Sequence, residues 1–172
     1  VLDGDVTIKN VTVNRSNGKP IYMQYLFPYD ANNTFGNYNL TIEGLDLNDA
    51  NDTLVVGNPN RFTFKDSQVE LLQPGGNNAG PQPFGDNAGI QIADYRGGDV
   101  TIDNVDVFME SPNYRIDFGN PGNNAVPFEI ATEGVGVTTN LVVKNSDITF
   151  GNIPSGSDTA AFRVKGSNNG TV

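Results

Sequence analysis

The chain contains no cysteine, no histidine and no tryptophan. Without Cys and His it has no disulfide framework, no Cys nucleophile, no His-based catalytic triad and no zinc site of the usual Cys/His type. Any acid–base chemistry is therefore left to carboxylates, Lys, Tyr and Arg.

Positive charge is also scarce. The 10 Lys and Arg residues face 20 Asp and Glu residues, which gives a formal net charge of −10 and a pI near 4.2. This balance argues against a nucleic-acid partner and against a polybasic membrane anchor, because both need clustered Lys and Arg. No apolar run approaches the ~20 residues that cross a bilayer, so we expect no membrane insertion.

Helical patterns are missing as well. No stretch of about 10–12 residues places apolar side chains at helical spacing behind a plausible cap. The 20 Gly and 10 Pro residues instead favour turns. A chain of 172 residues is long enough for one domain, so we expect a single all-β domain over residues 1–172.

One short pattern is repeated five times, and we call it the octet. Each copy reads apolar, Thr or Val, apolar, charged, then Asn, Asp or Gly, then a second alternating stretch. The copies are residues 6–13, 40–47, 62–69, 100–107 and 141–148. Alternation with period two predicts strands, and the central Asn, Asp or Gly tolerates the left-handed backbone that a sharp bend requires. A second short apolar element precedes most octets, at residues 21–23, 54–56, 90–92, 128–130 and 162–164.

Constant strands with variable spacing predict a parallel β-solenoid, a right-handed β-helix of about four to five coils with inserted loops. Equivalent side chains would then stack in columns. The first inward column would hold Val6, Leu40, Phe62, Val100 and Leu141, and the second would hold Ile8, Ile42, Phe64, Ile102 and Val143. The corner would hold Asn10, Asp66, Asn104 and Asn145, with each amide bonded to the next coil. A jelly roll or β-sandwich also has short strands, but it does not predict the same octet five times.

The segment 89–107, GIQIADYRGGDVTIDNVDV, resembles one coil of the pectin-lyase-like right-handed β-helix superfamily. The resemblance extends over nearly the whole chain and is closest in character to the solenoids of surface adhesins and autotransporter passengers. That superfamily also includes polysaccharide lyases, hydrolases and phage tailspikes. The resemblance therefore implies a fold and does not choose a function.

The two ends of the repeat fit each other. Val164 and Val172 are 8 positions apart, the same spacing that separates Ile92 from Val100, so Val172 stands where an octet would begin. Neither end shows the cap helix that seals many solenoids. Three interpretations remain open: a segment excised from a longer solenoid, a subunit that stacks head to tail and forms filaments, and a monomer with trimmed ends. The expected end-stacking residues are Val6, Ile8, Phe162, Val164 and Val172.

One acidic segment could bind calcium through oxygen ligands. Its candidate ligands are Asp46, Asn48, Asp49 and Asp52. The segment departs from an EF-hand loop because Ala50 stands at the fifth position and no Gly follows. A solvated polar turn explains the same composition, and we expect no other cofactor.

Asp94, Arg96 and Asp99 follow a short strand closely. In β-helix enzymes that cleave glycans, a carboxylate and a basic residue on one strand face do the chemistry. A surface ion pair at a bend is the simpler interpretation of these residues, and few cations are present to bind an acidic polysaccharide.

Three long insertions, residues 27–39, 72–88 and 109–127, carry aromatic side chains among Gly, Pro and Asn. These aromatics include Phe27, Tyr29, Tyr38, Phe84, Tyr114 and Phe118. Exposed aromatics in long loops stack on sugar rings or anchor partners. They could equally fold back over the wall of the solenoid.

Sequons for N-glycosylation are more frequent than random placement would give in a chain this rich in Asn. The candidates are Asn14, Asn32, Asn39, Asn51 and Asn169. Asn10 also lies in a sequon, but its expected place in the corner stack counts against modification.

Composition and pattern together favour a non-enzymatic, extracellular or cell-surface β-solenoid with a structural or adhesive role. Its partners would be further copies of itself, stacked head to tail, and cell-surface or glycan ligands. The alternatives are a polysaccharide-cleaving enzyme or phage tailspike fragment of the same superfamily, and a stand-alone glycan-binding module.

Overall fold

A computed structural model describes residues 4–16, 21, 38–50, 54–57, 59–72, 88–95, 98–110, 124–132, 139–152 and 158–166. Every regular element in these ranges is a strand. The strands are β1 (Gly4–Ser16), β2 (Tyr38–Ala50), β3 (Leu54–Gly57), β4 (Arg61–Leu72), β5 (Ala88–Tyr95), β6 (Gly98–Glu110), β7 (Asn124–Thr132), β8 (Thr139–Lys144), β9 (Asp147–Phe150), β10 (Asp158–Thr159) and β11 (Phe162–Gly166). The described part of the chain is therefore all-β, as its composition predicts.

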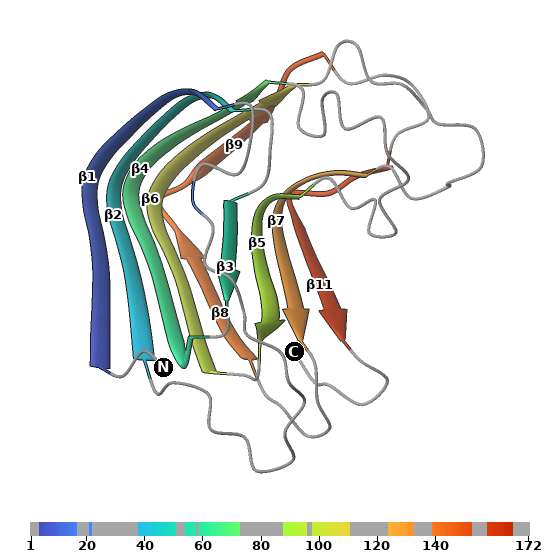
Figure 1. Ribbon diagram of the computed structural model, residues 1–172. Helices are drawn as coiled ribbons and strands as arrows, with labels where there is room; N and C mark the ends of the chain where they lie inside the picture. The colour runs from blue at the N-terminus through green and yellow to red at the C-terminus, as the bar shows by residue number, and fades with distance from the viewer. Residues whose placement is uncertain are drawn as a thin grey trace.

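The strands form two sheets, and all of their described pairings are parallel. The first sheet has the order β1-β2-β4-β6-β8, with β9 also paired to β6, and the second has the order β10-β7-β5-β3, with β11 paired to β7. From β2 to β8 the chain alternates between the two sheets, and Figure 1 shows the long bent strands of the first sheet side by side. This topology is compatible with a parallel β-helix and lacks the antiparallel pairing of a sandwich.

Each octet bends at its central residue, as the pattern predicts. The bend residues Asn10, Gly44, Asp66, Asn104 and Asn145 all have positive φ, between 51° and 67°. Asn, Asp and Gly accept this left-handed conformation at lower cost than other residue types. The first half of each octet therefore points its apolar side chains into the same core as the second half, around a corner.

The predicted inward columns are confirmed by the strand register. Val6, Leu40, Phe62, Val100 and Leu141 follow one another across the first sheet, and so do Ile8, Ile42, Phe64, Ile102 and Val143. The core lies between the two sheets, where the Phe64 and Phe128 rings meet edge to face with their centroids 6.4 Å apart. Phe128 also stacks on Phe162 at 5.2 Å.

Burial within each column falls off at both edges of the sheet. Ile42, Phe64 and Ile102 are at most 1% exposed. Ile8 on β1 is only partly buried, and Val143 on β8 is 38% exposed. The same apolar column is thus covered on both sides in the middle of the sheet and on one side at its edges.

Two matched substitutions test this difference in burial. Ile42→Ala should lower the free energy of unfolding by about 2–5 kcal/mol, because it leaves a cavity in a fully buried column. Ile8→Ala removes the same atoms from the partly exposed end of that column, so its cost should be less than about half as large. Urea unfolding followed by circular dichroism measures both, and equal costs would show that β1 is covered like an interior strand.

A second pair of substitutions tests the bend. Asn104→Gly and Asn104→Ala both remove the side chain, but only Ala has a Cβ that opposes a φ of 57°. We expect Asn104→Ala to be less stable than Asn104→Gly by about 1 kcal/mol in urea unfolding. Equal stabilities would mean that the bend relaxes without cost.

Candidate functional site

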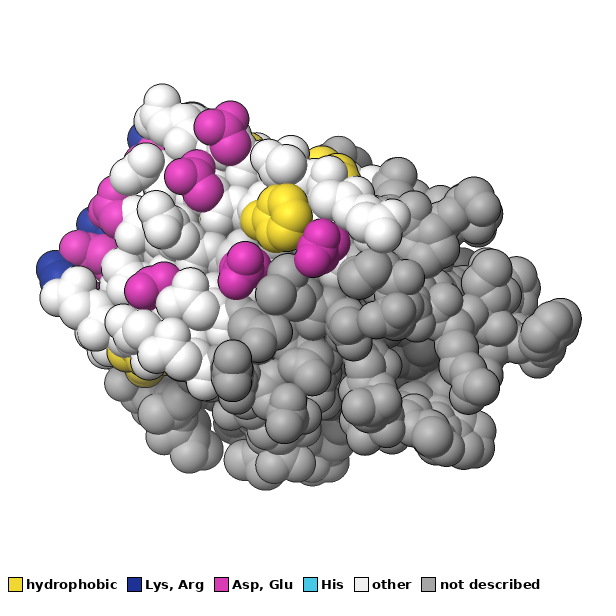
Figure 2. Space-filling view, turned by 90° about the horizontal axis from the view of Figure 1, so that it is seen from above, with side chains coloured by type: hydrophobic (Ala, Val, Ile, Leu, Met, Phe, Trp, Pro, Cys, Tyr) yellow, Lys and Arg dark blue, Asp and Glu magenta, His cyan; other side chains and the backbone are white. Residues whose placement is uncertain are grey.

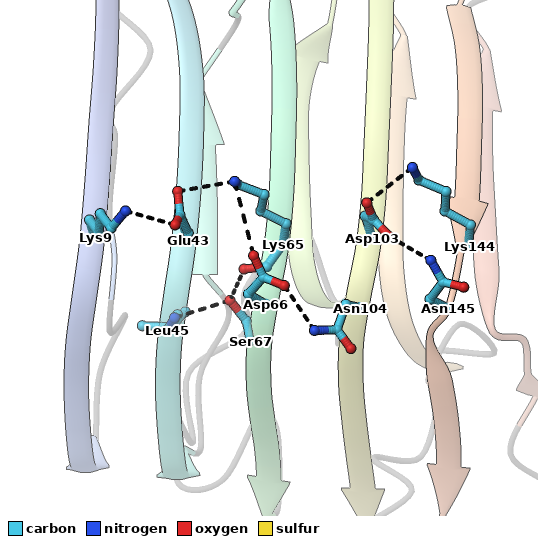
Figure 3. Close-up of polar contacts among 10 residues, drawn as sticks. All are labelled: Lys9, Glu43, Leu45, Lys65, Asp66, Ser67, Asp103, Asn104, Lys144 and Asn145. Carbon is cyan, nitrogen blue, oxygen red and sulfur yellow. Dashed lines mark hydrogen bonds and ion pairs between the residues drawn. The ribbon is translucent and has the colours of Figure 1, made fainter.

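A column of charged side chains crosses the outer face of the first sheet just before the bend. The strand register places Lys9, Glu43, Lys65, Asp103 and Lys144 in succession, so the sign of the charge alternates from strand to strand. We call this set the charged column. Figure 3 shows the side chains of Lys9 and Lys65 directed toward Glu43, and that of Lys144 directed toward Asp103. Glu43 lies 2.8 Å from Lys9 and 3.2 Å from Lys65, and Asp103 lies 3.1 Å from Lys144.

The charged column lowers the pKa of its two carboxyl groups. Hydrogen bonds from Lys9 and then Lys65 hold the pKa of Glu43 below its ordinary value of 4.5. Asp103 has a pKa below 3.8, first because Asn145 donates a hydrogen bond to it and then because Lys144 does. Both carboxylates therefore favour the folded state in their ionised form.

Side-chain amides form further ladders on the first sheet, and the five amide bonds described here run in one direction. Each amide Nδ2 donates to a residue on a preceding strand of the sheet. The bonds are Asn39 to Asp5 (2.8 Å), Asn48 to Asn14 (3.1 Å), Asn104 to Asp66 (2.8 Å), Asn140 to Asp99 (3.1 Å) and Asn145 to Asp103 (3.0 Å). The two edges of the first sheet are therefore chemically different.

The expected corner stack is only partly correct. Asn104 does bond Asp66 at the corner, but Asn145 bonds Asp103 instead of its corner neighbour. The stack is also interrupted at Gly44, where a Cβ would lie 2.7 Å from Oδ1 of Asn10. The φ of 67° favours glycine there, and a Cβ would also require the Asn10 side chain to shift.

Two serines directly after the bend were not found by sequence reasoning. Oγ of Ser67 accepts a bond from the backbone N–H of Leu45 at 3.0 Å and donates to the carbonyl of Lys65 at 2.7 Å. Ser146 repeats this arrangement with Val105 and Lys144, at 3.1 Å and 2.8 Å. The available signal was the shared Lys-Asx-Ser sequence of residues 65–67 and 144–146.

Beyond the bend, the outer face of the first sheet is acidic. One register column holds Asp46, Gln68, Asp106 and Asp147. It lines two adjoining shallow grooves of about 280 and 470 Å³, and among the residues that the structure describes no Lys or Arg lines either groove. Figure 2 looks onto this face and shows acidic side chains around an apolar patch. Phe108 and Glu70 belong to the lining of the larger groove, which could accept hydrogen bonds from hydroxyl groups and stack one ring.

The two edges of the first sheet form the second candidate site. Lys9 on β1 and Lys144 on β8 are 54% and 53% exposed, whereas the carboxylates between them are 23% and 29% exposed. Two predicted end-stacking residues on β1, Val6 and Ile8, pack against the core from its margin, as does Phe162 on β11. Val164 lies in β11, and Val172 lies outside the described residues.

The predicted calcium segment is a strand and not a turn as far as it is described. Asp46, Asn48 and Asp49 lie in β2, and Asp52 lies outside the described residues. The side-chain amide of Asn48 donates a hydrogen bond to Oδ1 of Asn14. Within the described ranges, no group of three or more acidic side chains is placed to hold a metal ion.

The weak catalytic candidates are not brought together as a reactive group in the described residues. Asp94 lies in β5, and Arg96 lies outside the described residues. Asp99 accepts a hydrogen bond from Asn140 and lies 3.4 Å from Arg61, so its described contacts belong to the surface ladders.

One predicted contact aromatic needs correction. Tyr38 begins β2 and is 8% exposed, so it belongs to the core and not to an exposed loop. Burial raises its pKa to about 12. The other candidates, Phe27, Tyr29, Phe84, Tyr114 and Phe118, lie outside the described residues.

Two of the predicted glycosylation sites lie on described strands. Asn14 on β1 accepts a hydrogen bond from Asn48, and Asn39 on β2 donates one to Asp5. Asn14 is exposed and Asn39 is partly exposed. Asn32, Asn51 and Asn169 lie outside the described residues.

Comparison of the chain with known protein families, with curated proteins and with solved structures found no match. The described residues include no helix with the length and apolar character to cross a membrane.

The lowered pKa of Glu43 predicts a pH dependence of stability. Because its pKa is lower in the folded state, its contribution is fully present above the ordinary value of 4.5 and is lost as the pH falls through the folded-state value. Between about pH 5 and pH 3, the free energy of unfolding of the wild type should fall more steeply than that of Glu43→Gln. Parallel urea titrations across this range measure the difference, and identical slopes would contradict the assignment.

Proposed function

We propose that this chain is a right-handed parallel β-helix of about four to five coils with a non-enzymatic, extracellular or cell-surface role. It serves as a structural or adhesive segment, and its open edges bind further coils head to tail. The parallel sheets, the alternation of the chain between them and the five octets support the fold. They are the features that a coil repeated along one axis requires.

The observation that carries the proposal is the loss of burial at the two edges of each apolar column. Ile42 and Ile102 are at most 1% exposed, but Val143 is 38% exposed. A further strand laid against β8 or β1 would cover these side chains and pair the edge backbone, and each Å² of apolar surface removed from water contributes about 25 cal/mol.

The direction of the amide ladders supports head-to-tail association. All strands run parallel, and each described amide bond points to a preceding strand. The edge at β1 therefore complements the edge at β8 and not a second copy of itself. Such heterologous contacts do not close unless a ring forms, so they generate open stacks.

A second candidate function is glycan binding in the acidic grooves, with polysaccharide cleavage as its enzymatic form. It is favoured by the larger groove, where Phe108 lies among polar side chains that include Glu70, Asp106 and Asp147. Carboxylates that accept hydroxyl groups beside an aromatic ring suit a sugar.

Electron microscopy and sedimentation of the chain at high concentration test head-to-tail association. The measurement is made in about 1 M NaCl, because salt screens the repulsion between copies that each carry a net negative charge. It is done first with calcium present and then after chelation. We expect stacks with an axial rise of roughly 20–25 Å per copy, because strands lie ~4.8 Å apart along the axis. Discrete monomers at every concentration would contradict self-stacking, and a screen of soluble glycans against the grooves would then decide for the second candidate.

A further inference from the structure

The charged column begins and ends with the same sign. Its signs read plus, minus, plus, minus, plus from Lys9 on β1 to Lys144 on β8. Each terminal Lys has a carboxylate on one side only, Glu43 for Lys9 and Asp103 for Lys144. Both Lys side chains are more than half exposed, so each has room for a second partner beyond its edge.

A direct head-to-tail contact between two copies would break this alternation. The register that runs through the sheet would place Lys144 of one copy beside Lys9 of the next, one strand spacing or about 4.8 Å apart. Like charges directly opposite on neighbouring strands are destabilising, whereas opposite charges stabilise. No carboxylate of the charged column would lie between these two ammonium groups.

Two other outward columns are compatible with the same contact. They would bring Asn140 beside Asp5 and Asp147 beside Thr12, in the order that the printed register fixes. A carboxamide beside a carboxylate still pairs a donor with an acceptor, although the amide here lies on the preceding strand, whereas Asn39 donates to Asp5 from the following strand. Of these three outward columns, only the charged column opposes a second copy of the chain.

We propose that the preferred neighbour at either edge is a parallel strand of the octet type with Asp or Glu in register with Lys9 or Lys144. The inference rests on the proposed function and names its partner: a coil whose charged position is acidic, as in β2 and β6, and not an identical copy. The apolar columns and the backbone supply affinity for any such strand. The charged column determines specificity, because like charges across an interface disfavour binding of the wrong partner.

The test uses self-association of the full chain, with the dissociation constant measured by sedimentation at about 20 mM and about 1 M NaCl. Lys9→Glu turns one edge acidic while Glu43 keeps its contact with Lys65. Two copies then meet as Lys144 against an acidic side chain, and the dissociation constant at low salt should fall about tenfold below that of the wild type. Lys144→Glu should have the same effect from the opposite edge. The inference can therefore still be tested if one of the two variants fails to fold.

The double variant Lys9→Glu/Lys144→Glu restores like charges and should associate as weakly as the wild type. Gln68→Glu adds a negative charge on an interior strand, and it should not tighten association at low salt. At high salt all variants should agree within about threefold, because the screening length is then ~3 Å. Urea unfolding confirms that each variant is folded.

Net charge alone makes the opposite prediction. The chain already carries −10, and each Lys→Glu change makes it more negative by two, so general repulsion would weaken association at low salt. Association that weakens or stays unchanged in both single variants would overturn the charge inference while leaving the open edges in place. If no variant associates at either salt concentration, head-to-tail binding at the edges is itself wrong, and the inference falls with it.

Discussion

Parallel pairing in register is the constraint on which the rest of the molecule depends. It places each residue of one octet on the equivalent residue of the next, so a side chain's neighbours along the sheet are decided by its position in the repeat. Apolar positions then form continuous columns, charged positions form a column of alternating sign that holds the ion pairs of Glu43 with Lys9 and Lys65 and of Asp103 with Lys144, and amides form ladders. The same rule explains the low burial at the edges, where a column ends for want of another strand.

Much of this arrangement follows from the sequence, because aligning the octets with one another also predicts which residues are paired on neighbouring strands. The period-two alternation identified the strands, and the Asn, Asp or Gly at the centre of each octet identified the bends, all of which have positive φ. The inward columns came from aligning the octets. Corner bonding was harder to predict because Gly44 has no side chain to continue the stack, and Asn145 bonds Asp103 instead.

Other features depend on contacts that no single segment specifies. Ser67 and Ser146 looked like ordinary polar positions because the amides that they bond lie on another strand. Tyr38 looked like a loop aromatic because β2 begins earlier than its octet. The segment after Asp46 looked like a polar turn, although a strand with one solvated face tolerates the same residues on its outer side. The alternating signs of the charged column were visible only after the octets were set in order.

The two serines also make each bend depend on a residue that is synthesised later than the bend itself. The acceptor for the Leu45 amide lies 22 positions further along the chain, and the acceptor for the Val105 amide lies 41 positions further along. In each case, the earlier strand exposes a donor whose side-chain acceptor is synthesised later. The bend in β2 is therefore completed by β4, and the bend in β6 by the junction of β8 and β9. During synthesis from the N-terminus, the backbone amides of Leu45 and Val105 would therefore gain their side-chain acceptors only after the later serine has been made.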